Sequence, residues 1–160
     1  MEKTFSLEVG TFTNLWALRA ALRKAGVKLY DDTSEVISKV KLIKAAQRLN
    51  FIVKSPQELG LSGRIHTHDI HEEAIRQGLG LCPPEAAIQY ILQCFAGLNL
   101  WEKLFFAMKP LFNREARYRA FQVENFHNHP NLNTYVSHPT KDWLAGYHFV
   151  FTVPPEKKND

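Results

Sequence analysis

Three polar residues spaced four apart interrupt an otherwise apolar segment, PEAAIQYILQCFA, at residues 84–96: Glu85, Gln89 and Gln93. On an α-helix, residues four apart share one face, so the carboxyl and the two amides would form a single stripe. A helix that is apolar on its other sides is usually buried, and an unpaired buried polar group costs about 1–3 kcal/mol. The stripe therefore predicts either a ligand pocket or an internal hydrogen-bond network.

Two further residues extend this candidate site. Glu124 ends the predicted strand FQVE and would face the stripe if that strand packs on the helix. Carboxyls and amides lining one cleft suit ligand binding, and they suit acid–base chemistry where one carboxyl has a raised pKa. Cys82 precedes the helix, whose N-terminus would lower the pKa of its thiol and favour nucleophilic reactivity. The ligand-binding candidates are Cys82, Glu85, Gln89, Gln93 and Glu124.

The segment HTHDIHEE, at residues 66–73, gathers three histidines and three acidic residues. His68 and His71 are three apart and share a helical face, where neutral imidazoles would suit a divalent metal. The spacing differs from the HExxH metalloprotease motif, and Glu85 stands where a zinc deaminase needs its second cysteine. An exposed polar helix start is the favoured interpretation, so neither a metal nor another cofactor is predicted. If a metal binds, its candidate ligands are His66, His68 and His71.

A second group of possible catalytic residues lies in the C-terminal part, where turn residues surround several histidines. The HNHPN segment is not an HNH nuclease motif, because the residues of that motif are far apart along the chain. In a loop rich in Pro and Asn such residues usually form turns. The members of this group are His127, His129, His138, Asp142 and His148.

Positive charge is concentrated near the N-terminus. The whole chain has 20 Lys and Arg against 16 Asp and Glu, a net charge of +4, and residues 1–64 alone carry a net +5. Basic residues on the two predicted N-terminal helices would suit contacts with phosphate groups, although a solvated helix face explains the same pattern. The nucleic-acid candidates are Arg19, Arg23, Lys24, Lys41 and Lys44.

Hydrophobic patterning and capping residues predict the elements that would hold these side chains. Asn14 and Thr67 are expected to cap helices, and SPQE, Ser55 to Glu58, has the form of a capping box. Strands are expected at residues 4–9, 49–54, 103–108, 118–124, 133–136 and 147–153. Helices are expected at about residues 14–25, 35–48, 66–77 and 84–96. This order gives an α+β fold, an α-rich N-terminal part followed by an antiparallel β-sheet of about four strands. One domain is predicted at 1–153, with a flexible tail at 154–160.

The two cysteines bear on the cellular compartment. Cys82 and Cys94 lie about 18 Å apart if the segment between them is helical, too far for a disulfide. Unpaired thiols in a chain that starts without a secretory signal favour the cytosol. The longest uncharged stretch, at residues 86–101, is too short and too polar to predict a membrane span.

Several motifs occur in a fixed order along the chain. LGLCPPE, with Gln89 and Gln93 downstream, is followed by AMKP, FQVE, HPTKDW and HFVF, and is preceded by GTF and ELGLSG. Over nearly the whole chain this pattern resembles a family of small bacterial proteins of unknown function. The resemblance implies a bacterial cytosolic protein with helices followed by strands, and it supports the same five ligand-binding candidates. Ala87-Ile88 and Lys103 stand where Gly-Pro and Trp are usual, so the cleft is expected to have a different shape here.

The sequence favours a small bacterial cytosolic binding or accessory module, with a polar cleft between the 84–96 helix and the C-terminal sheet. The first alternative is a nuclease-like or toxin-like hydrolase that docks nucleic acid through its basic N-terminal helices. Glu85 or Glu124 would then work with a histidine as acid and base. The second alternative is a protein-interaction partner, such as an antitoxin or a subunit, that presents its aromatic sheet. The expected partners are a small ligand or a protein, with nucleic acid as the alternative and no membrane.

Overall fold

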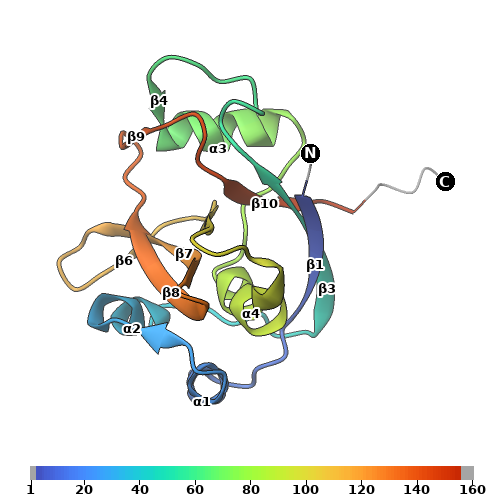
Figure 1. Cartoon of the computed structure of the whole chain (residues 1–160), viewed down its shortest axis with the longest axis vertical. Helices are drawn as coiled ribbons and strands as arrows, with labels where there is room; N and C mark the ends of the chain where they lie inside the picture. Colours follow the sequence, from blue (N-terminus) through green and yellow to red (C-terminus); the bar gives the residue numbers. More distant parts are fainter. Residues whose placement is uncertain (1–2, 156–160) are drawn as a thin grey trace.

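Two β-sheets organise residues 3–155, the part of the chain that this computed structural model describes (Figure 1). The strands of the larger, eight-stranded sheet are β1 (Lys3–Val9), β2 (Lys28–Leu29), β3 (Gln47–Lys54), β5 (Lys103–Phe106), β6 (Leu111–Phe112), β7 (Tyr118–Phe126), β8 (His129–Val136) and β10 (Phe149–Val153). Their order is β1-β3-β10-β5-β7-β8-β2, and β6 pairs with β7. The β10–β5 and β2–β8 pairs are parallel, and the other pairs are antiparallel. The smaller sheet pairs β4 (Ile65–His66) with β9 (Asp142–Trp143).

Four α-helices accompany the sheets within the same described residues. They are α1 (Leu15–Lys24), α2 (Asp31–Ile37), α3 (Thr67–Arg76) and α4 (Glu85–Gln93), and a 3₁₀ turn, η1 (Phe95–Gly97), follows α4. In Figure 1, α4 is enclosed between β1 and β3 on one side and β7 and β8 on the other. The helices α1 and α2 lie at one end of the molecule, and α3 lies with β4 and β9 at the other.

Alternation along β5 divides the core into two apolar layers. Phe106 points to the face covered by α4, where its ring centroid lies 5.9 Å from that of Tyr90. Phe105 points to the opposite face, because successive strand residues alternate, and there its ring lies 5.0 Å from Trp143 and 5.2 Å from Tyr135. All five side chains are buried. Burying one phenylalanine side chain stabilises the fold by about 1.5–3 kcal/mol, so β5 contributes to both layers.

The predicted α+β class is confirmed, but two parts of the predicted layout are wrong. The main sheet has eight strands within the described residues rather than about four, and its pairing is mixed rather than antiparallel. Helices are not confined to the N-terminal part, since α3 and α4 lie in the middle of the chain. The cause is β10, which pairs with β3 on one side and β5 on the other and so joins N-terminal and C-terminal strands into one sheet.

The helix predicted at 35–48 is also wrong. The structure has a shorter helix, α2, in which Asp31 and Asp32 occupy the first turn, where the helix dipole favours acidic side chains. The following residues leave the helix, and β3 begins at Gln47. Of the predicted helix, only Gln47 and Arg48 join the β1–β3 ladder, and residues 38–46 form turns and irregular structure between α2 and β3.

Local capping signals were better guides. Asn14 Oδ1 accepts the backbone N–H of Ala17 at 2.8 Å and caps α1, as predicted. The predicted capping box is also present, with Ser55 and Glu58 bonding to each other's backbone N–H groups at 3.0 and 3.1 Å. The cap of α3 lies at His66, one residue before the predicted position.

Three remaining predictions concern the cysteines, the tail and the membrane. Cys82 and Cys94 are both free thiols. Of the predicted tail, residues 156–160 lie outside the described residues, while 154–155 are exposed and have no regular structure. Among residues 3–155, no helix combines the length and the apolar character that crossing a membrane requires.

Candidate functional site

The side chain of Glu85 joins three segments of the chain. It begins α4 and is fully buried. Its Oε2 accepts hydrogen bonds from the backbone N–H of Gly10 at 2.7 Å and from Gln89 Nε2 at 3.0 Å. Its Oε1 accepts the backbone N–H of Ile43 at 3.1 Å. One carboxyl therefore ties the start of α4 to the segment after β1 and to the segment before β3.

Gln89 and Gln93 continue the same network along α4. Gln89 Nε2 also donates to Thr11 Oγ1 at 2.9 Å, and Gln89 Oε1 accepts from Gln93 Nε2 at 2.7 Å. Gln93 then bonds both the backbone N–H of Glu8 at 3.0 Å and its carbonyl at 2.8 Å. Each side-chain oxygen and nitrogen of the stripe has a protein partner, so the stripe forms a hydrogen-bond network between α4 and β1.

The structure does not bring Glu124 to this stripe. Glu124 lies on β7 opposite Lys103, with its Oε1 3.8 Å from Lys103 Nζ. It shares a sheet face with Gln122, whose partner Phe105 points away from α4. The stripe meets β1 rather than the C-terminal strands, so the predicted cleft is not formed by these residues.

Cys82 lies close to the start of α4, but its environment is the opposite of the one predicted. Its side chain is buried, and its Sγ donates to the carbonyl of Val150 at 3.2 Å. Burial raises the pKa of the Cys82 thiol well above its ordinary value. The prediction of a lowered pKa is therefore wrong, and Cys82 is a packed core residue.

The basic candidates divide into one structural residue and four exposed ones. Arg19 donates to the hydroxyl of Ser34 at 2.8 Å and to its carbonyl at 2.7 Å, so it ties α1 to α2. The four exposed side chains come from the last turn of α1 and from the loop between α2 and β3: Arg23, Lys24, Lys41 and Lys44. Trp16, on the same helix as Arg19, has 77 % of its surface exposed.

The three histidines of HTHDIHEE separate into two environments. His66 and His68 lie together at the start of α3, with ring centroids 5.5 Å apart. His71, one turn further along α3, is more deeply buried and lines a cavity of about 90 Å³ with His68, Tyr118 and Ser137. Desolvation lowers the pKa of His71 to about 4, and its Nε2 has no hydrogen-bond partner among the described residues. The three histidines therefore do not form one metal site.

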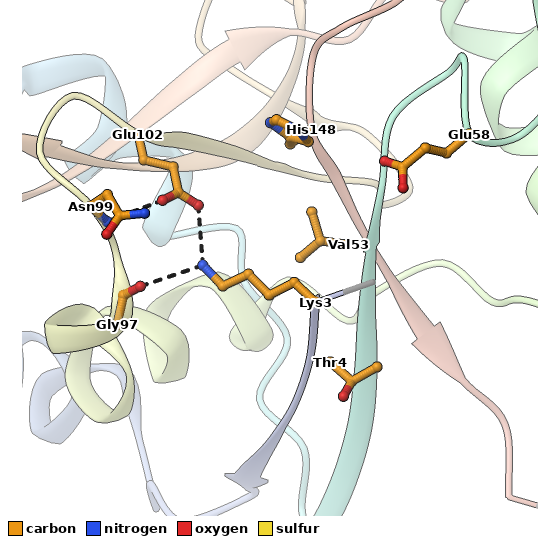
Figure 2. A pocket seen from close by; sticks show the side chains of 8 residues that line it. All are labelled: Lys3, Thr4, Val53, Glu58, Gly97, Asn99, Glu102 and His148. Carbon is orange, nitrogen blue, oxygen red and sulfur yellow. Dashed lines mark hydrogen bonds and ion pairs between the residues drawn. The ribbon is translucent and has the colours of Figure 1, made fainter. Parts of the chain in front are cut away.

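A larger hollow, of about 550 Å³, opens where β1, β3, β5 and β10 meet (Figure 2). We call it the Lys3–Glu58 hollow. Lys3 Nζ lies 3.1 Å from Glu102 Oε1, and Glu102 Oε2 accepts the backbone N–H of Asn99 at 3.1 Å. Figure 2 shows Glu102 and Glu58 on either side of Val53 and His148. The lining residues are Lys3, Thr4, Val53, Glu58, Gly97, Asn99, Glu102 and His148.

Negative charge is in excess in the lining of the hollow. Its charged groups are one lysine, Lys3, and two glutamates, Glu58 and Glu102. The backbone hydrogen bond from Ser55 holds the pKa of Glu58 below its ordinary value, so Glu58 is ionised at neutral pH. Asn99 and His148 add polar groups that both donate and accept hydrogen bonds. The hollow thus offers paired carboxylates, one ammonium and two neutral polar groups.

Sequence reasoning missed most of this hollow. Lys3, Asn99 and Glu102 were not candidates, and His148 was interpreted as a turn residue. Glu58 was recognised only as half of a capping box, which it is, but the same side chain also lines the hollow. The lining residues come from five separate parts of the chain, so no local spacing could have indicated them.

An exposed aromatic cluster lies at the turn between β7 and β8. Trp101, Phe126 and His127 contact one another, with ring centroids 4.4–5.4 Å apart. Trp101 and Phe126 expose 51 % and 42 % of their surfaces. Apolar surface of this kind is what a protein-interaction module would present, and that alternative stays a prediction.

Comparison with known protein families, with curated proteins and with solved structures found no match to this chain. The resemblance to small bacterial proteins therefore stays a prediction, and the function has to be argued from the geometry.

Proposed function

We propose that this chain is a small-molecule-binding protein whose ligand occupies the Lys3–Glu58 hollow. The observation that carries the proposal is the convergence of Lys3, Glu58, Glu102 and His148 from distant parts of the sequence around one hollow of about 550 Å³. Sites for small molecules usually measure about 300–1,000 Å³ and contain a few polar groups that fix the ligand's orientation. The proposed site lies beyond the C-terminal end of α4 rather than along its polar stripe.

The charges indicate the class of ligand. Lys3 is already paired with Glu102, whereas the ionised carboxylate of Glu58 lies on the other side of the hollow. A carboxylate at the wall of a hollow favours a ligand with an ammonium group, because a charge-assisted hydrogen bond is stronger than a neutral one. Asn99 and His148 would receive hydroxyl or carbonyl groups of the same molecule. The proposed ligand is a small hydrophilic amine.

A screen of small polar compounds checks this proposal. We expect amines, and not carboxylic acids of similar size, to raise the melting temperature of the protein. Glu58→Gln should weaken binding of those amines by about 10-fold or more, because a charged hydrogen bond is worth about 1.5–3 kcal/mol. The amide oxygen of the variant can still accept the N–H of Ser55, so the capping bond is kept.

Glu115→Gln is the matched control, because Glu115 pairs with Arg117 on the surface and does not line the hollow. Isothermal titration of the best amine with the three proteins measures the effect. Equal affinity for the wild-type and Glu58→Gln proteins, or a screen in which only acids bind, would contradict the proposal.

A second candidate function is binding of single-stranded nucleic acid, and the exposed Trp16 favours it. Trp16, Arg23 and Lys24 fall on one face of α1, opposite the buried Leu18 and Leu22. Trp16 and Arg23 are seven residues apart, or about 10 Å along the helix. An exposed aromatic ring that can stack on a base, beside cations that can contact phosphates, is typical of single-strand binding surfaces.

For this second function we expect a fluorescent oligonucleotide to bind at 50 mM salt and to bind far more weakly at about 200 mM salt. Trp16→Ala should reduce the affinity by about 5- to 100-fold, because stacking on one base contributes about 1–3 kcal/mol. Trp101→Ala, which removes an exposed tryptophan outside α1, should leave the affinity unchanged. Fluorescence anisotropy gives all three values, and equal effects of the two substitutions would refute a role for α1.

A further inference from the structure

Three metal-ligating side chains converge where β4 leads into α3. His66 ends β4, and Asp69 lies in the first turn of α3, where its Oδ2 accepts the backbone N–H of His66 at 2.9 Å. His68 lies between them in the sequence, and its ring is 5.5 Å from that of His66. The side chains of His66, His68 and Asp69 expose 25 %, 43 % and 34 % of their surfaces, so all three can be reached from solvent.

The donor atoms are close enough to share one ion. His68 Nδ1 lies 3.3 Å from Asp69 Oδ1, and His66 Nδ1 lies 3.6 Å from Asp69 Oδ2. One donor atom from each residue lies within 4.8 Å of the other two. Ligands about 2.0–2.1 Å from a tetrahedral ion are about 3.4 Å apart. The two measured distances are close to this value but involve different oxygens of Asp69, so a side-chain rotation must bring one oxygen to both imidazoles.

A fourth residue fixes the orientation of His66. Antiparallel pairing of β4 and β9 sets Asp142 opposite His66, and Asp142 Oδ1 lies 3.1 Å from His66 Nε2. Arg64 Nε donates to the same Oδ1 at 3.2 Å and holds the carboxylate in place. A carboxylate that takes the N–H of a histidine on the side away from the ion is the common outer arrangement of protein metal sites.

In this orientation of the His66 ring, two hydrogen-bond acceptors, Nδ1 of His66 and the carboxylate of Asp69, lie close to each other. When Nε2 of His66 donates to Asp142, the other ring nitrogen, Nδ1, is an acceptor that lies 3.6 Å from Asp69 Oδ2, and the capping box of α3 also directs the backbone N–H of Asp69 toward the His66 side chain. A lone pair and a carboxylate oxygen repel each other unless a hydrogen-bond donor or a cation lies between them, and a metal ion is one such cation. His68 Nδ1 approaches the same carboxylate, so donor atoms of three side chains gather within 4.8 Å of one another.

We propose that His66, His68 and Asp69 bind one divalent transition-metal ion of the Zn²⁺, Co²⁺ or Ni²⁺ class, with Asp142 as the positioning residue. Two imidazole nitrogens and one carboxylate oxygen suit these ions better than Mg²⁺ or Ca²⁺, which prefer oxygen ligands alone. Three protein ligands leave further coordination positions for water or for an atom of a bound molecule. His71 is not a ligand, because it is not among the three residues whose donor atoms lie within 4.8 Å of one another.

This metal site is distinct from the Lys3–Glu58 hollow and goes beyond the proposed function. None of the four residues lines that hollow. The variants that test one proposal therefore leave the other site unchanged, and either can fail without the other.

Metal titration of the full chain tests the proposal. We expect protein freed of metal with a chelator, and then freed of the chelator, to bind about one equivalent of Zn²⁺ in a competition assay with a chromophoric chelator. His68→Gln should weaken this affinity by at least about 100-fold, and Asp142→Asn should weaken it by about 10- to 100-fold through loss of orientation. His129→Gln, which removes an exposed histidine on β8, is the matched control and should leave the affinity unchanged.

A second measurement needs no variant. In ¹H–¹⁵N spectra of the histidine rings, Zn²⁺ should shift the Nδ1 resonances of two histidines and leave the other five in place. Absent binding, equal affinity of the wild-type and His68→Gln proteins, or ring shifts on other histidines would overturn the proposal.

Discussion

Replacing Glu85 by alanine is expected to lower the free energy of unfolding by about 3–4 kcal/mol, because the substitution removes the carboxyl that accepts hydrogen bonds from two backbone N–H groups. Gly10 and Ile43 both donate to this carboxyl, and Gln89 loses one of its partners as well. Each stranded donor costs about 1–3 kcal/mol, and water cannot replace a side chain that is fully buried without opening the contact. Urea unfolding followed by circular dichroism measures the change.

Two variants separate the carboxyl's role from a general effect of the substitution. Glu85→Gln keeps one acceptor oxygen but turns an amide donor toward Gly10 or Ile43, so its effect should fall between wild type and Glu85→Ala. Glu115→Ala removes an exposed carboxylate and should change the free energy of unfolding by no more than about 0.5 kcal/mol. The prediction fails if Glu85→Ala lowers the free energy of unfolding by less than about 1 kcal/mol while the slope of that free energy against urea concentration is unchanged. The network of Glu85, Gln89 and Gln93 would then not stabilise the fold.

Gly10→Ala should destabilise the protein about as much as Glu85→Ala. We expect it to lower the free energy of unfolding by at least about 3 kcal/mol and the melting temperature by about 6–12 °C. Gly10 has a φ of +75°, and a Cβ there would lie 2.4 Å from the carbonyl oxygen of Ala45 and 2.7 Å from its carbon. Both are backbone atoms close to Val9 and Gln47, the pair at the end of the β1–β3 ladder, so they cannot move away without disturbing the sheet. A shift of residue 10 would also disturb the hydrogen bond from its backbone N–H to Glu85.

Gly26→Ala is the control for the cost of the backbone conformation alone. Gly26 has a φ of +72°, but a Cβ there would meet nothing within 4 Å. Gly26→Ala should lower the free energy of unfolding by about 1–2 kcal/mol, which is the cost of a left-handed backbone conformation for a residue with a Cβ. Thermal and urea unfolding of both variants gives the difference. An equal decrease in the free energy of unfolding for Gly10→Ala and Gly26→Ala would show that the close approach of Ala45 does not constrain the fold.

Local patterns predicted individual elements well, and pairing between distant segments explains where they failed. Asn14 and the Ser55–Glu58 pair were recognised because a cap depends on residues within one turn. The segment after Ile37 carries apolar residues at helical spacing, but it forms turns and irregular structure until β3 begins at Gln47, where pairing with β1 fixes the strand. Periodicity within 35–48 contains no information about a partner forty residues away.

The candidate site shows the same limit. The spacing of Glu85, Gln89 and Gln93 predicted a shared helix face, and the structure places all three in one network. Which surface they meet depends on the position of α4 relative to β1, and the sequence order had suggested the C-terminal strands instead. In the same way, Lys3 and Glu102 are ninety-nine residues apart, and only the strand order of the sheet brings them to 3.1 Å.

The central place of β10 has a consequence for the nascent chain. β10 lies between β3 and β5, yet among the strands of residues 3–155 it is the last to be synthesised. Until residue 153 has left the ribosome, β1 with β3 and β5 with β7 and β8 are two half-sheets whose inner edges have no partner. Such edges pair readily with other chains, and closing them late makes folding slow. Vectorial synthesis thus leaves both inner edges open to aggregation until β10 emerges, and binding of a chaperone during that interval would benefit this fold more than one whose sheet is completed from its N-terminus.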